Sequence, residues 1–421
     1  MKKKIWILNH YASTMYTNKA GRHYWFAENL IKNGYNPTIF CASTFHNSTE
    51  IIETGVHKYV ENTVDNIPFV FVETPKYIGN GKQRIKNMLV FYKNIFIVAK
   101  EYAKIHGKPD VILASSVHPL TLVAGIKIAK KFGIPCICEV RDLWPETLVA
   151  YGNLKDNNIF TKLLFLGEKW IYKNADKLIF TMEGGKDYII ERGWDQENGG
   201  SVDISKVHHI NNGIDLEVYD FNKKNYTLED KDLNREDTFK VVYTGSIRKV
   251  NNVKRIVEAA EIINKMGYTN IMFLIYGDGP EKEELEKYCR SNNLENILFK
   301  GFVDKNKVPY VLSKSNLNIM HFQQSSLKKY GASLNKMFEY FASGKPTISD
   351  CEFGYDLIQK YNAGIVLDNA DANQIAEGIL EILKMSNKNY DLYSKNALEA
   401  AKDYDFKKLT MELIGVIENK K

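Results

Sequence analysis

The sequence predicts an α/β protein built from two Rossmann-like halves. Short apolar runs alternate with amphipathic segments along most of the 421 residues, which is typical of parallel strands joined by crossover helices. The chain is too long for one hydrophobic core, so two domains are expected. The same alternation starts again after a highly charged stretch, residues 220–239, which we interpret as a linker.

In the first half, polar side chains follow the expected strands. Strands are expected at residues 4–8, 37–42, 110–115, 134–140 and 177–181. Helices are expected at residues 22–33, 120–132 and 159–173. A polar loop follows the first strand and has Gly21 near its end, His118 follows the third strand, and Asp142 and Glu146 follow the fourth. Open α/β sheets bind ligands at the carboxyl ends of their strands, so these are candidate site residues. An ion pair between Asp142 and Arg141 is the structural alternative.

The second half repeats this order of elements. Strands are expected at residues 240–243, 271–276, 297–301, 317–321 and 364–367, and one begins at 347. Helices are expected at residues 253–265 and 281–291, and in the tail. Gly245 and Gly277 follow its first two strands. We expect domains at 1–212 and 213–404, and a C-terminal helix at about 405–421 that packs back on the first domain.

The stretch 327–349 predicts an anion-binding helix. Ser333 is a good N-cap and Gly344 a stop signal, so the helix is expected to begin at Ser333. Its free N–H groups and dipole favour an anion, and Lys328, Lys329 and Lys336 add positive charge. Glu339, further along, can accept two hydroxyl hydrogen bonds, as from a ribose. The alternative is an ordinary amphipathic helix with a solvated glutamate.

The positive charge of the chain is concentrated in its first half. Residues 1–212 hold 27 Lys and Arg against 20 Asp and Glu. Residues 76–108 hold eight basic residues and one acidic residue, with apolar residues at helical spacing. Such a helix can bind anionic lipid or a lipid phosphate, although its apolar stripe can equally pack on the domain. The candidate acceptor and membrane contacts are Lys82, Arg84, Lys86, Lys93 and Lys100.

The sequence lacks the motifs of several common kinds of site. There is no phosphate-binding loop of nucleoside triphosphatases, dinucleotide fingerprint, nucleophile elbow, zinc motif or nucleic-acid module. The acidic pairs Asp230-x-Asp232 and Asp403-x-Asp405 are interpreted as solvated charge, so neither a metal nor a cofactor is expected. The five scattered cysteines are interpreted as buried free thiols. Without a signal peptide or a membrane span, we expect a cytoplasmic protein.

Four segments resemble glycosyltransferase family 4, whose members are retaining enzymes. The runs GDGPEKEEL and NKMFEYFASGKPTI resemble the family's second half. The run RDLWPE and the pattern KYGxSxNK resemble its bacterial surface-polysaccharide branch, which builds capsule and O-antigen. The resemblance covers essentially the whole chain and implies the GT-B fold, in which two Rossmann-like domains face each other across a cleft.

The resemblance implies a nucleotide-sugar donor, usually UDP-linked, held mainly by the second half. Glu339 matches the glutamate that holds the ribose, Val303 the position that reads the base, and His118 a histidine on the transferred sugar. Gly21 matches a first-loop glycine close to the donor. The full donor set is Gly21, Gly245, Arg248, Lys254, Gly277, Val303, Lys328, Tyr330, Gly331, Ala332, Ser333, Asn335, Lys336 and Glu339.

The sequence departs from the family at two places. Gly331 stands where the first motif glutamate is expected, and we expect the N–H groups of 331–333 to replace its contact. The usual Arg/Lys pair falls on Ser246 and Asn252, so Arg248 becomes the candidate for the diphosphate, with Lys254 second.

The sequence therefore predicts a metal-independent hexosyltransferase with its catalytic groups in both halves. Arg248 would stabilise the leaving diphosphate, His118 would contact the sugar, and Asp142 or Glu146 would orient the acceptor. The expected partners are a UDP-sugar, a glycan or polyprenyl-diphosphate-linked acceptor and the anionic inner membrane face, without nucleic acid. The alternatives are a sugar-nucleotide epimerase, which needs no acceptor, and a non-catalytic UDP-sugar-binding assembly subunit.

Overall fold

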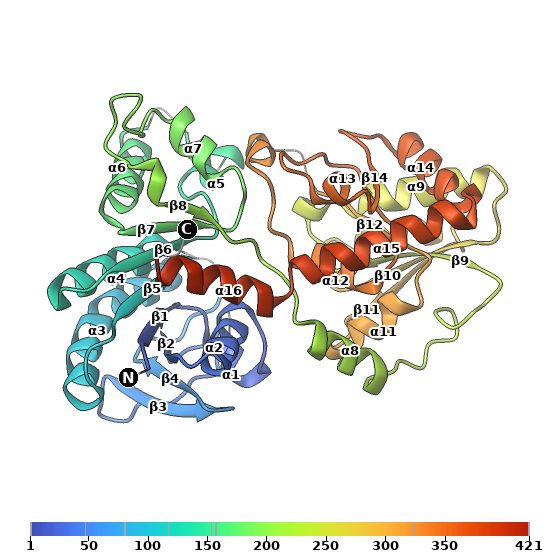
Figure 1. Cartoon of the computed structure of the whole chain (residues 1–421). Coiled ribbons are helices and arrows are strands. Elements are labelled where there is room, and N and C mark those ends of the chain that lie inside the picture. Colours follow the sequence, from blue (N-terminus) through green and yellow to red (C-terminus); the bar gives the residue numbers. More distant parts are fainter. Residues whose placement is uncertain are drawn as a thin grey trace. The chain divides into compact units, whose positions relative to one another are not determined.

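The chain forms two units. The computed structural model describes residues 2–46, 48–79, 81–116, 118–152, 154–155, 158–322 and 325–419. The first unit comprises Met1–Asn211 and Phe406–Lys421, and the second comprises Asn212–Asp405 (Figure 1). The chain leaves the first unit after Asn211 and returns to it at Phe406, so the second unit is an insertion in the first.

An eight-stranded sheet organises the first unit. Its strand order is β3-β4-β2-β1-β5-β6-β7-β8. The strands are β1 (Lys4–Leu8), β2 (Asn36–Ala42), β3 (Tyr59–Val64), β4 (Ile67–Val72), β5 (Val111–Ser115), β6 (Cys136–Val140), β7 (Lys177–Phe180) and β8 (Val207–His209). All neighbours are parallel except the edge strand β3, which is antiparallel to β4. The order reverses at β1, which pairs with both β2 and β5, and such a reversal is where ligands bind.

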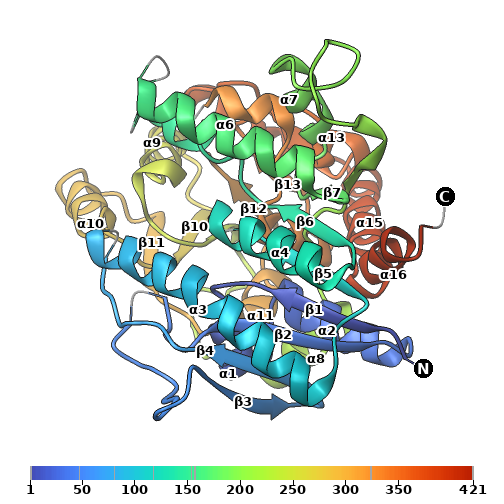
Figure 2. The ribbon, with the colours of Figure 1, turned by 90° about the vertical axis from the view of Figure 1, so that its left-hand side faces the viewer.

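Helices cover both faces of this sheet. They are α1 (Ser13–Asn18), α2 (Arg22–Lys32), α3 (Lys82–His106), α4 (Pro119–Phe132), α5 (Glu146–Ala150), α6 (Ile159–Asn174), α7 (Gly185–Glu191) and α16 (Phe406–Ile417), with a 3₁₀ turn η1 (Ile204–Lys206). Figure 2 shows α3, α4 and α6 side by side. The C-terminal α16 packs on α2, where the ring of Phe406 lies 4.8 Å from Trp25 and 5.4 Å from Phe26.

The second unit has a six-stranded parallel sheet in the order β11-β10-β9-β12-β13-β14. The strands are β9 (Phe239–Thr244), β10 (Ile271–Tyr276), β11 (Ile297–Gly301), β12 (Leu317–Met320), β13 (Thr347–Ser349) and β14 (Gly364–Val366). The helices are α8 (Leu216–Asn225), α9 (Lys254–Lys265), α10 (Lys282–Ser291), α11 (Val308–Ser313), α12 (Asn335–Ser343), α13 (Leu357–Tyr361), α14 (Ala372–Lys384) and α15 (Asn387–Asp403). The 3₁₀ turns are η2 (Lys249–Asn251), η3 (Lys305–Lys307) and η4 (Ser326–Tyr330). The order reverses at β9, between β10 and β12.

The prediction of a linker at residues 220–239 is wrong. This stretch lies inside the second unit, contains most of α8, and includes Leu233, which is fully buried. Two of its carboxylates are paired within the fold, since the Lys300 amine lies 2.8 Å from Asp230 and 2.7 Å from Asp232. The hydroxyl of Tyr276 also donates to Asp230.

Both acidic pairs are therefore structural rather than solvated, contrary to the sequence-based interpretation. Asp403 accepts a hydrogen bond from the hydroxyl of Tyr361, and the buried Asp405 accepts one from the N–H of Leu216. The five cysteines are free and buried. None of the helices in the described ranges is both long and apolar enough to cross a bilayer.

Candidate functional site

Two glycine loops of the second unit meet at the ends of neighbouring strands. Gly245 follows β9 and Gly277 follows β10, and a Cβ atom on Gly277 would lie 1.8 Å from the carbonyl oxygen of Gly245. Gly277 also has a φ of 150°, which L side chains rarely adopt. Only glycine fits there, because any side chain would collide with backbone. The two loops thus form a bare backbone surface at the carboxyl edge of the sheet.

The amine of Lys336 lies beside this surface. Its Nζ is 3.0 Å from the place where a Cβ on Gly245 would be, and it donates to the hydroxyl of Tyr243 at 3.1 Å. Burial lowers the pKa of Lys336 to about 8, although the charge of Glu339 opposes the shift. A cation at two glycine loops suits a phosphate group.

Glu339 lies one turn further along α12, on a half-buried part of the helix. Burial raises the pKa of its carboxyl group, while the charges of Lys305 and Lys336 act against that rise. Within the described part of the chain, the Glu339 carboxylate has neither a hydrogen bond nor an ion pair. A half-buried carboxylate without a partner is costly to the fold, and it can accept hydroxyl groups of a ligand.

The helix begins later than predicted. α12 starts at Asn335, after Leu334 in the N-cap position, so the prediction of Ser333 as the N-cap is wrong. The reason is that Ser333 Oγ instead accepts the backbone N–H of Asn212 at 3.0 Å. The side-chain amide of Asn212 donates to Asn335 Oδ1. The start of α12 is thus tied to the first residue of the second unit.

In the loop before α12, some of the groups predicted to bind an anion are already bonded within the protein. The N–H of Gly331 donates to the carbonyl of Lys328 at 3.0 Å, so it cannot replace the contact of the missing glutamate. The N–H of Ala332 has no partner among the described residues. The Lys328 amine forms an ion pair with Asp368 at 2.7 Å. Tyr330 is buried, with its ring under the amine of Lys329.

The remaining donor candidates lie on the loops after β9 and β11 and at the start of α9. The side chain of Arg248 is exposed and makes no hydrogen bond or ion pair with any described residue. Lys254 is exposed at the start of α9, 3.9 Å from Glu258. Val303 lines an open cavity of about 360 Å³ together with Phe302 and Tyr276. Arg248, three residues after Gly245 in the sequence, therefore remains a candidate cation for the diphosphate.

In the first unit, His118 is bonded to a second histidine that the sequence analysis missed. His118 is the N-cap residue of α4 and is buried. Its Nε2 lies 2.8 Å from Nδ1 of His10, which follows β1, and Nε2 of His10 lies 2.6 Å from Oδ1 of Asn87 on α3. Burial, reinforced by the charge of Arg84, lowers the pKa of His118 to about 3. The imidazole is therefore neutral at physiological pH.

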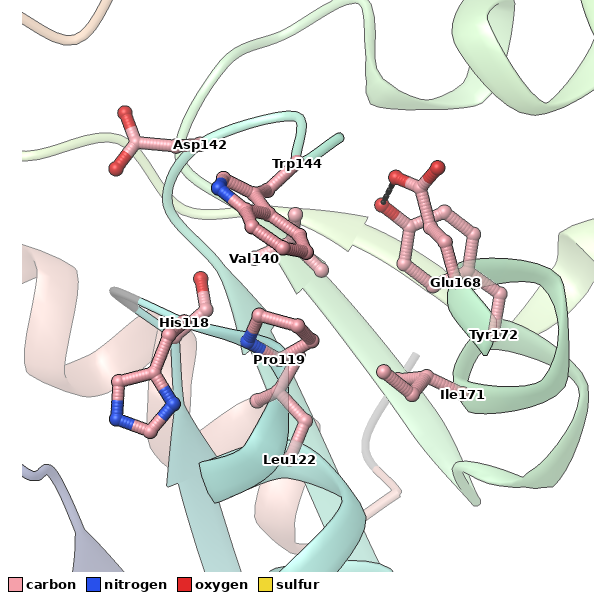
Figure 3. A pocket seen from close by; sticks show the side chains of 10 residues that line it. His118, Pro119, Leu122, Val140, Asp142, Trp144, Glu168, Ile171 and Tyr172 are labelled. Atoms are coloured by element: carbon pink, nitrogen blue, oxygen red, sulfur yellow. Dashed lines mark hydrogen bonds between the residues drawn. The ribbon is translucent and has the colours of Figure 1, made fainter. Parts of the chain in front are cut away.

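A small cavity lies beside His118 at the ends of β5 and β6 (Figure 3). It measures about 20 Å³, enough for one water. Its lining residues are Ser116, His118, Pro119, Leu122, Val140, Asp142, Trp144, Glu168, Ile171 and Tyr172. The buried Glu168 accepts hydroxyl hydrogen bonds from Tyr172 and Tyr188. Burial raises the pKa of Glu168 to about 8, although these bonds oppose the shift.

The two predicted acceptor carboxylates differ in availability. Asp142 is exposed, and neither a hydrogen bond nor an ion pair joins it to Arg141 or to any other described residue. Glu146, at the start of α5, forms an ion pair with Arg192. The guanidinium of Arg192 also stacks on Phe165 at 3.8 Å. The structure thus leaves Asp142 as the available carboxylate and makes Glu146 a structural ion-pair partner.

Gly21 immediately precedes α2, at φ 117°. A Cβ atom there would lie 3.1 Å from Met15 Cγ, so a side chain would be both strained and crowded. The next residue, Arg22, is buried and bonded to Glu139 at 2.8 Å. Arg22 also donates to the carbonyls of Ile210 and Asn211, so it fixes the last residues before the chain enters the second unit.

The basic helix α3 is only partly as predicted. Lys82, Lys86, Lys93 and Lys100 are exposed. Arg84 is half-buried, donates to the Tyr11 hydroxyl at 3.1 Å and lies over its ring, so its guanidinium already has a partner within the first unit. The sequence analysis also missed an exposed apolar row on α6. Its members are Ile159, Phe160, Leu163, Leu166 and Trp170.

No group of three or more His, Cys, Asp or Glu side chains arranged to hold a metal ion occurs in the part of the chain that the structure describes.

Comparisons with known proteins agree with the two-unit fold. Residues 24–218 match a model described as Glycosyltransferase Family 4, and residues 226–399 match one described as Glycosyl transferases group 1. An uncharacterized glycosyltransferase of Methanocaldococcus jannaschii is 24% identical over 59% of this chain and 60% of its own. A putative teichuronic acid biosynthesis glycosyltransferase of Bacillus subtilis is 25% identical over 50% of this chain and 49% of its own.

The chain thus spans about half to three fifths of the length of these curated relatives. Among solved structures, Anabaena HepE, in complex with UDP and glucose, superimposes with a TM-score of 0.66. The match covers 99% of this chain and 100% of HepE at 13% identity, so it shows a shared fold alone.

Proposed function

Because the chain belongs to glycosyltransferase family 4, we propose that it transfers a hexose from a UDP-sugar, with retention of configuration, to an acceptor. The acceptor is a glycan or a polyprenyl-diphosphate-linked saccharide in the synthesis of a bacterial capsule- or O-antigen-type polysaccharide. The name of the Bacillus subtilis relative, which refers to teichuronic acid biosynthesis, supports this class of product. The UDP in the HepE complex supports the choice of nucleotide.

The observation that carries the proposal is the pairing of Lys336 and Glu339 on one turn of α12. The amine of Lys336 lies at the bare glycine backbone of Gly245 and Gly277, where a diphosphate can approach closely. The Glu339 carboxylate has no partner in the described chain and can accept two ribose hydroxyls. A phosphate site and a ribose site one helical turn apart fit a nucleoside diphosphate.

The proposed transfer requires the protein to stabilise negative charge on the leaving diphosphate. Breaking the glycosidic bond to the diphosphate gathers negative charge on the leaving group, and Lys336, Arg248 and the N–H of Ala332 would stabilise it. By analogy with the loss of one oxyanion-hole donor, losing one such contact should raise the barrier by roughly 3–4 kcal/mol. These cations make a metal unnecessary in this scheme, so EDTA should leave turnover unchanged. His118 would contact the transferred sugar, and Asp142 would orient the acceptor hydroxyl.

We place the protein at the cytoplasmic face of the cell membrane. The exposed lysines of α3 can bind anionic headgroups, and the apolar row of α6 can insert at the interface. Helices α3 and α6 lie on the same side of the first unit's sheet, on either side of α4 (Figure 2).

Flotation with vesicles that contain anionic lipid tests this placement. Binding should fall with salt, when Lys86, Lys93 and Lys100 are replaced by Gln, and when Leu163 and Leu166 are replaced by Ser. Because all five side chains are exposed, these changes should leave the fold intact. Vesicle binding that is indifferent to all three changes would reject the placement.

Thermal unfolding with UDP and a panel of UDP-sugars tests the donor site. A nucleotide at 100 times its dissociation constant should add about 2.7 kcal/mol to the free energy of unfolding. Glu339→Ala should lose this stabilisation, whereas Glu377→Ala, an exposed change on α14, should keep it. No stabilisation by any UDP compound would reject the donor site.

Product analysis separates the alternatives. Conversion of the sugar nucleotide without an acceptor would identify an epimerase, and UDP binding without transfer or hydrolysis would identify a binding subunit.

A further inference from the structure

Three buried side chains form a continuous hydrogen-bonded relay that ends at His118. Asn87 comes from α3, His10 follows β1, and His118 precedes α4. Their exposed fractions are 0%, 1% and 4%, so none of the three exchanges its bonds with bulk water. They meet where the ends of β1 and β5 lie side by side, at the point where the strand order reverses.

The orientation of Asn87 sets the direction of the relay. Its Nδ2 donates to the carbonyl of Pro75 at 2.7 Å and to Thr44 Oγ1 at 2.9 Å. A backbone carbonyl only accepts, so the amide nitrogen must face Pro75, and the oxygen, Oδ1, must face His10. Because Oδ1 also only accepts, Nε2 of His10 carries the hydrogen.

The same reasoning extends to His118. Burial, together with the neighbouring His118 and Arg84, lowers the pKa of His10 well below its usual value, so the ring is neutral. Because Nε2 carries the hydrogen, Nδ1 of His10 has a free lone pair. The rings of Phe91 and Tyr11, 4.4 and 4.5 Å away, pack against the His10 imidazole. His10 Nδ1 must then accept a hydrogen from Nε2 of His118. The second nitrogen of His118, Nδ1, is left as a lone pair.

That lone pair is unused within the described chain. His118 Nδ1 is buried and has no hydrogen-bond partner among the described residues, and it makes no capping bond to α4. A buried acceptor without a partner is destabilising, which suits an atom reserved for a ligand.

We propose that Asn87 and His10 are positioning residues that fix His118 in the Nε2–H form, so that Nδ1 accepts a hydrogen bond from one hydroxyl of the transferred sugar. The inference rests on the proposed function for the identity of the sugar, but not for the state of the relay. A hydrogen-bond acceptor at this point favours a sugar that carries a hydroxyl there. A sugar in which that hydroxyl is replaced by fluorine, a methoxy group or a hydrogen atom cannot donate this hydrogen bond.

The state of the relay can be measured without substrate. In the full chain labelled with ¹⁵N-histidine, the ring nitrogens of His118, assigned by their loss in His118→Ala, should appear as protonated Nε2 and unprotonated Nδ1. Asn87→Leu should mix the two forms. The matched control is Asn94→Leu on the same helix, because Asn94 is also buried but donates to Glu73. A protonated Nδ1 in the unchanged protein would overturn the relay.

Kinetics test the role of the relay in the reaction, with UDP-glucose and UDP-N-acetylglucosamine as donors. Asn87→Leu and His10→Phe should lower kcat/KM about 10–100-fold, by analogy with the loss of the residues that orient metal-bound imidazoles. His10→Gln should recover part of the loss, since its amide oxygen can accept from His118. Asn94→Leu should stay within about threefold. Equal losses of kcat/KM in Asn87→Leu and Asn94→Leu would mean that the relay stabilises the fold and does not position His118 for the reaction.

Deoxyfluoro donors identify the hydroxyl. Replacing one sugar hydroxyl by fluorine should lower kcat/KM in the unchanged protein but much less in His118→Ala. If no position shows this coupling, the sugar contact is wrong even where the NMR result stands. Turnover of neither donor would count against the proposed function and the sugar contact together, whereas the NMR measurement judges the relay alone.

Discussion

The amine of Lys336 lies 3.1 Å from the hydroxyl of Tyr243 and 4.4 Å from the centre of its ring. The Tyr243 hydroxyl gives its own hydrogen to the carbonyl of Ser246 at 2.9 Å, so it receives one from Lys336. The tyrosine therefore holds the lysine beside Gly245 and leaves the other hydrogens of the amine for a ligand.

Diphosphate binding should depend on the charge of Lys336. Since its pKa is lowered to about 8, Lys336 is charged below that pH and loses its charge above it. Lys336 should cause no loss of UDP affinity below pH 7 and a fall of up to about tenfold per pH unit above 8, because only the charged amine attracts the diphosphate. Isothermal titration with UDP from pH 6 to 10 measures this.

Lys336→Met should weaken UDP binding at pH 7 and abolish the alkaline decline, and Lys265→Met, an exposed change on α9, should alter neither. An alkaline decline that survives in Lys336→Met would assign the titration to another group.

Glu339 should lower the stability of the ligand-free protein and strengthen its binding of UDP. Replacing an unpartnered, half-buried carboxylate by Gln should raise the free energy of unfolding of the ligand-free protein at pH 7 by about 0.5–2 kcal/mol. The same change should weaken UDP binding about 10–100-fold through the lost hydroxyl contacts. Denaturation without ligand and titration with UDP measure the two effects.

Deoxy-UDP, which lacks the 2′-hydroxyl, provides the control. The unchanged protein should prefer UDP over deoxy-UDP, and Glu339→Gln should largely lose that preference. An undiminished preference in the variant would mean that Glu339 does not contact the ribose.

Gly277 should not tolerate a methyl group. The Cβ of an alanine there would lie 1.8 Å from the Gly245 carbonyl oxygen, so one of the two strand-end loops must move. Gly277→Ala should cost more than about 3 kcal/mol of unfolding free energy. Gly267→Ala shares a positive φ but meets no atom within 4 Å, and should cost only about 1–2 kcal/mol. Urea denaturation measures the loss of unfolding free energy in each variant. Equal losses would mean that backbone strain, and not the collision with Gly245, determines the cost at Gly277.

Glu168 should make the stability of the protein depend on pH. Its pKa is raised to about 8 from an ordinary 4.5, so between these values the folded chain holds a proton that the unfolded chain has lost. The free energy of unfolding should therefore rise as the pH falls from 8 to 4.5, by on the order of a few kcal/mol from this group. Glu168→Gln keeps a donor and an acceptor for Tyr172 and Tyr188 and should flatten this part of the curve. Parallel stability curves for the two proteins would contradict the assignment.

The regular elements with local signals were predictable. Strand 4–8 is a short apolar run, and the helix from Arg22 is followed by Gly34, so the signals for both lie in or beside the elements themselves. The hairpin β3–β4 was missed because β3 is a half-exposed edge strand, with Glu61 and Asn62 interrupting its apolar pattern. Its turn, Asp65-Asn66, has two positive φ angles, and this dipeptide was the available signal.

The candidate site was predictable in its residue types but not in its partnerships. Glu339 and Lys336 lie on one helix, so their spacing was visible in the sequence. His10 and His118 lie 108 residues apart, and only the pairing of β1 with β5 brings them together. Likewise Ser333 is a good N-cap by residue type, but a distant backbone group, the N–H of Asn212, takes its oxygen.

The return of α16 to the first unit has a consequence for synthesis on the ribosome. The apolar surface of α2 around Trp25 and Phe26 stays uncovered until Phe406 emerges, after the whole of 212–405 has been made. At 5–20 residues per second that delay is roughly 10–40 s. The unit whose translation begins first is thus completed last, and its nascent form should depend on chaperones until the second unit has been made.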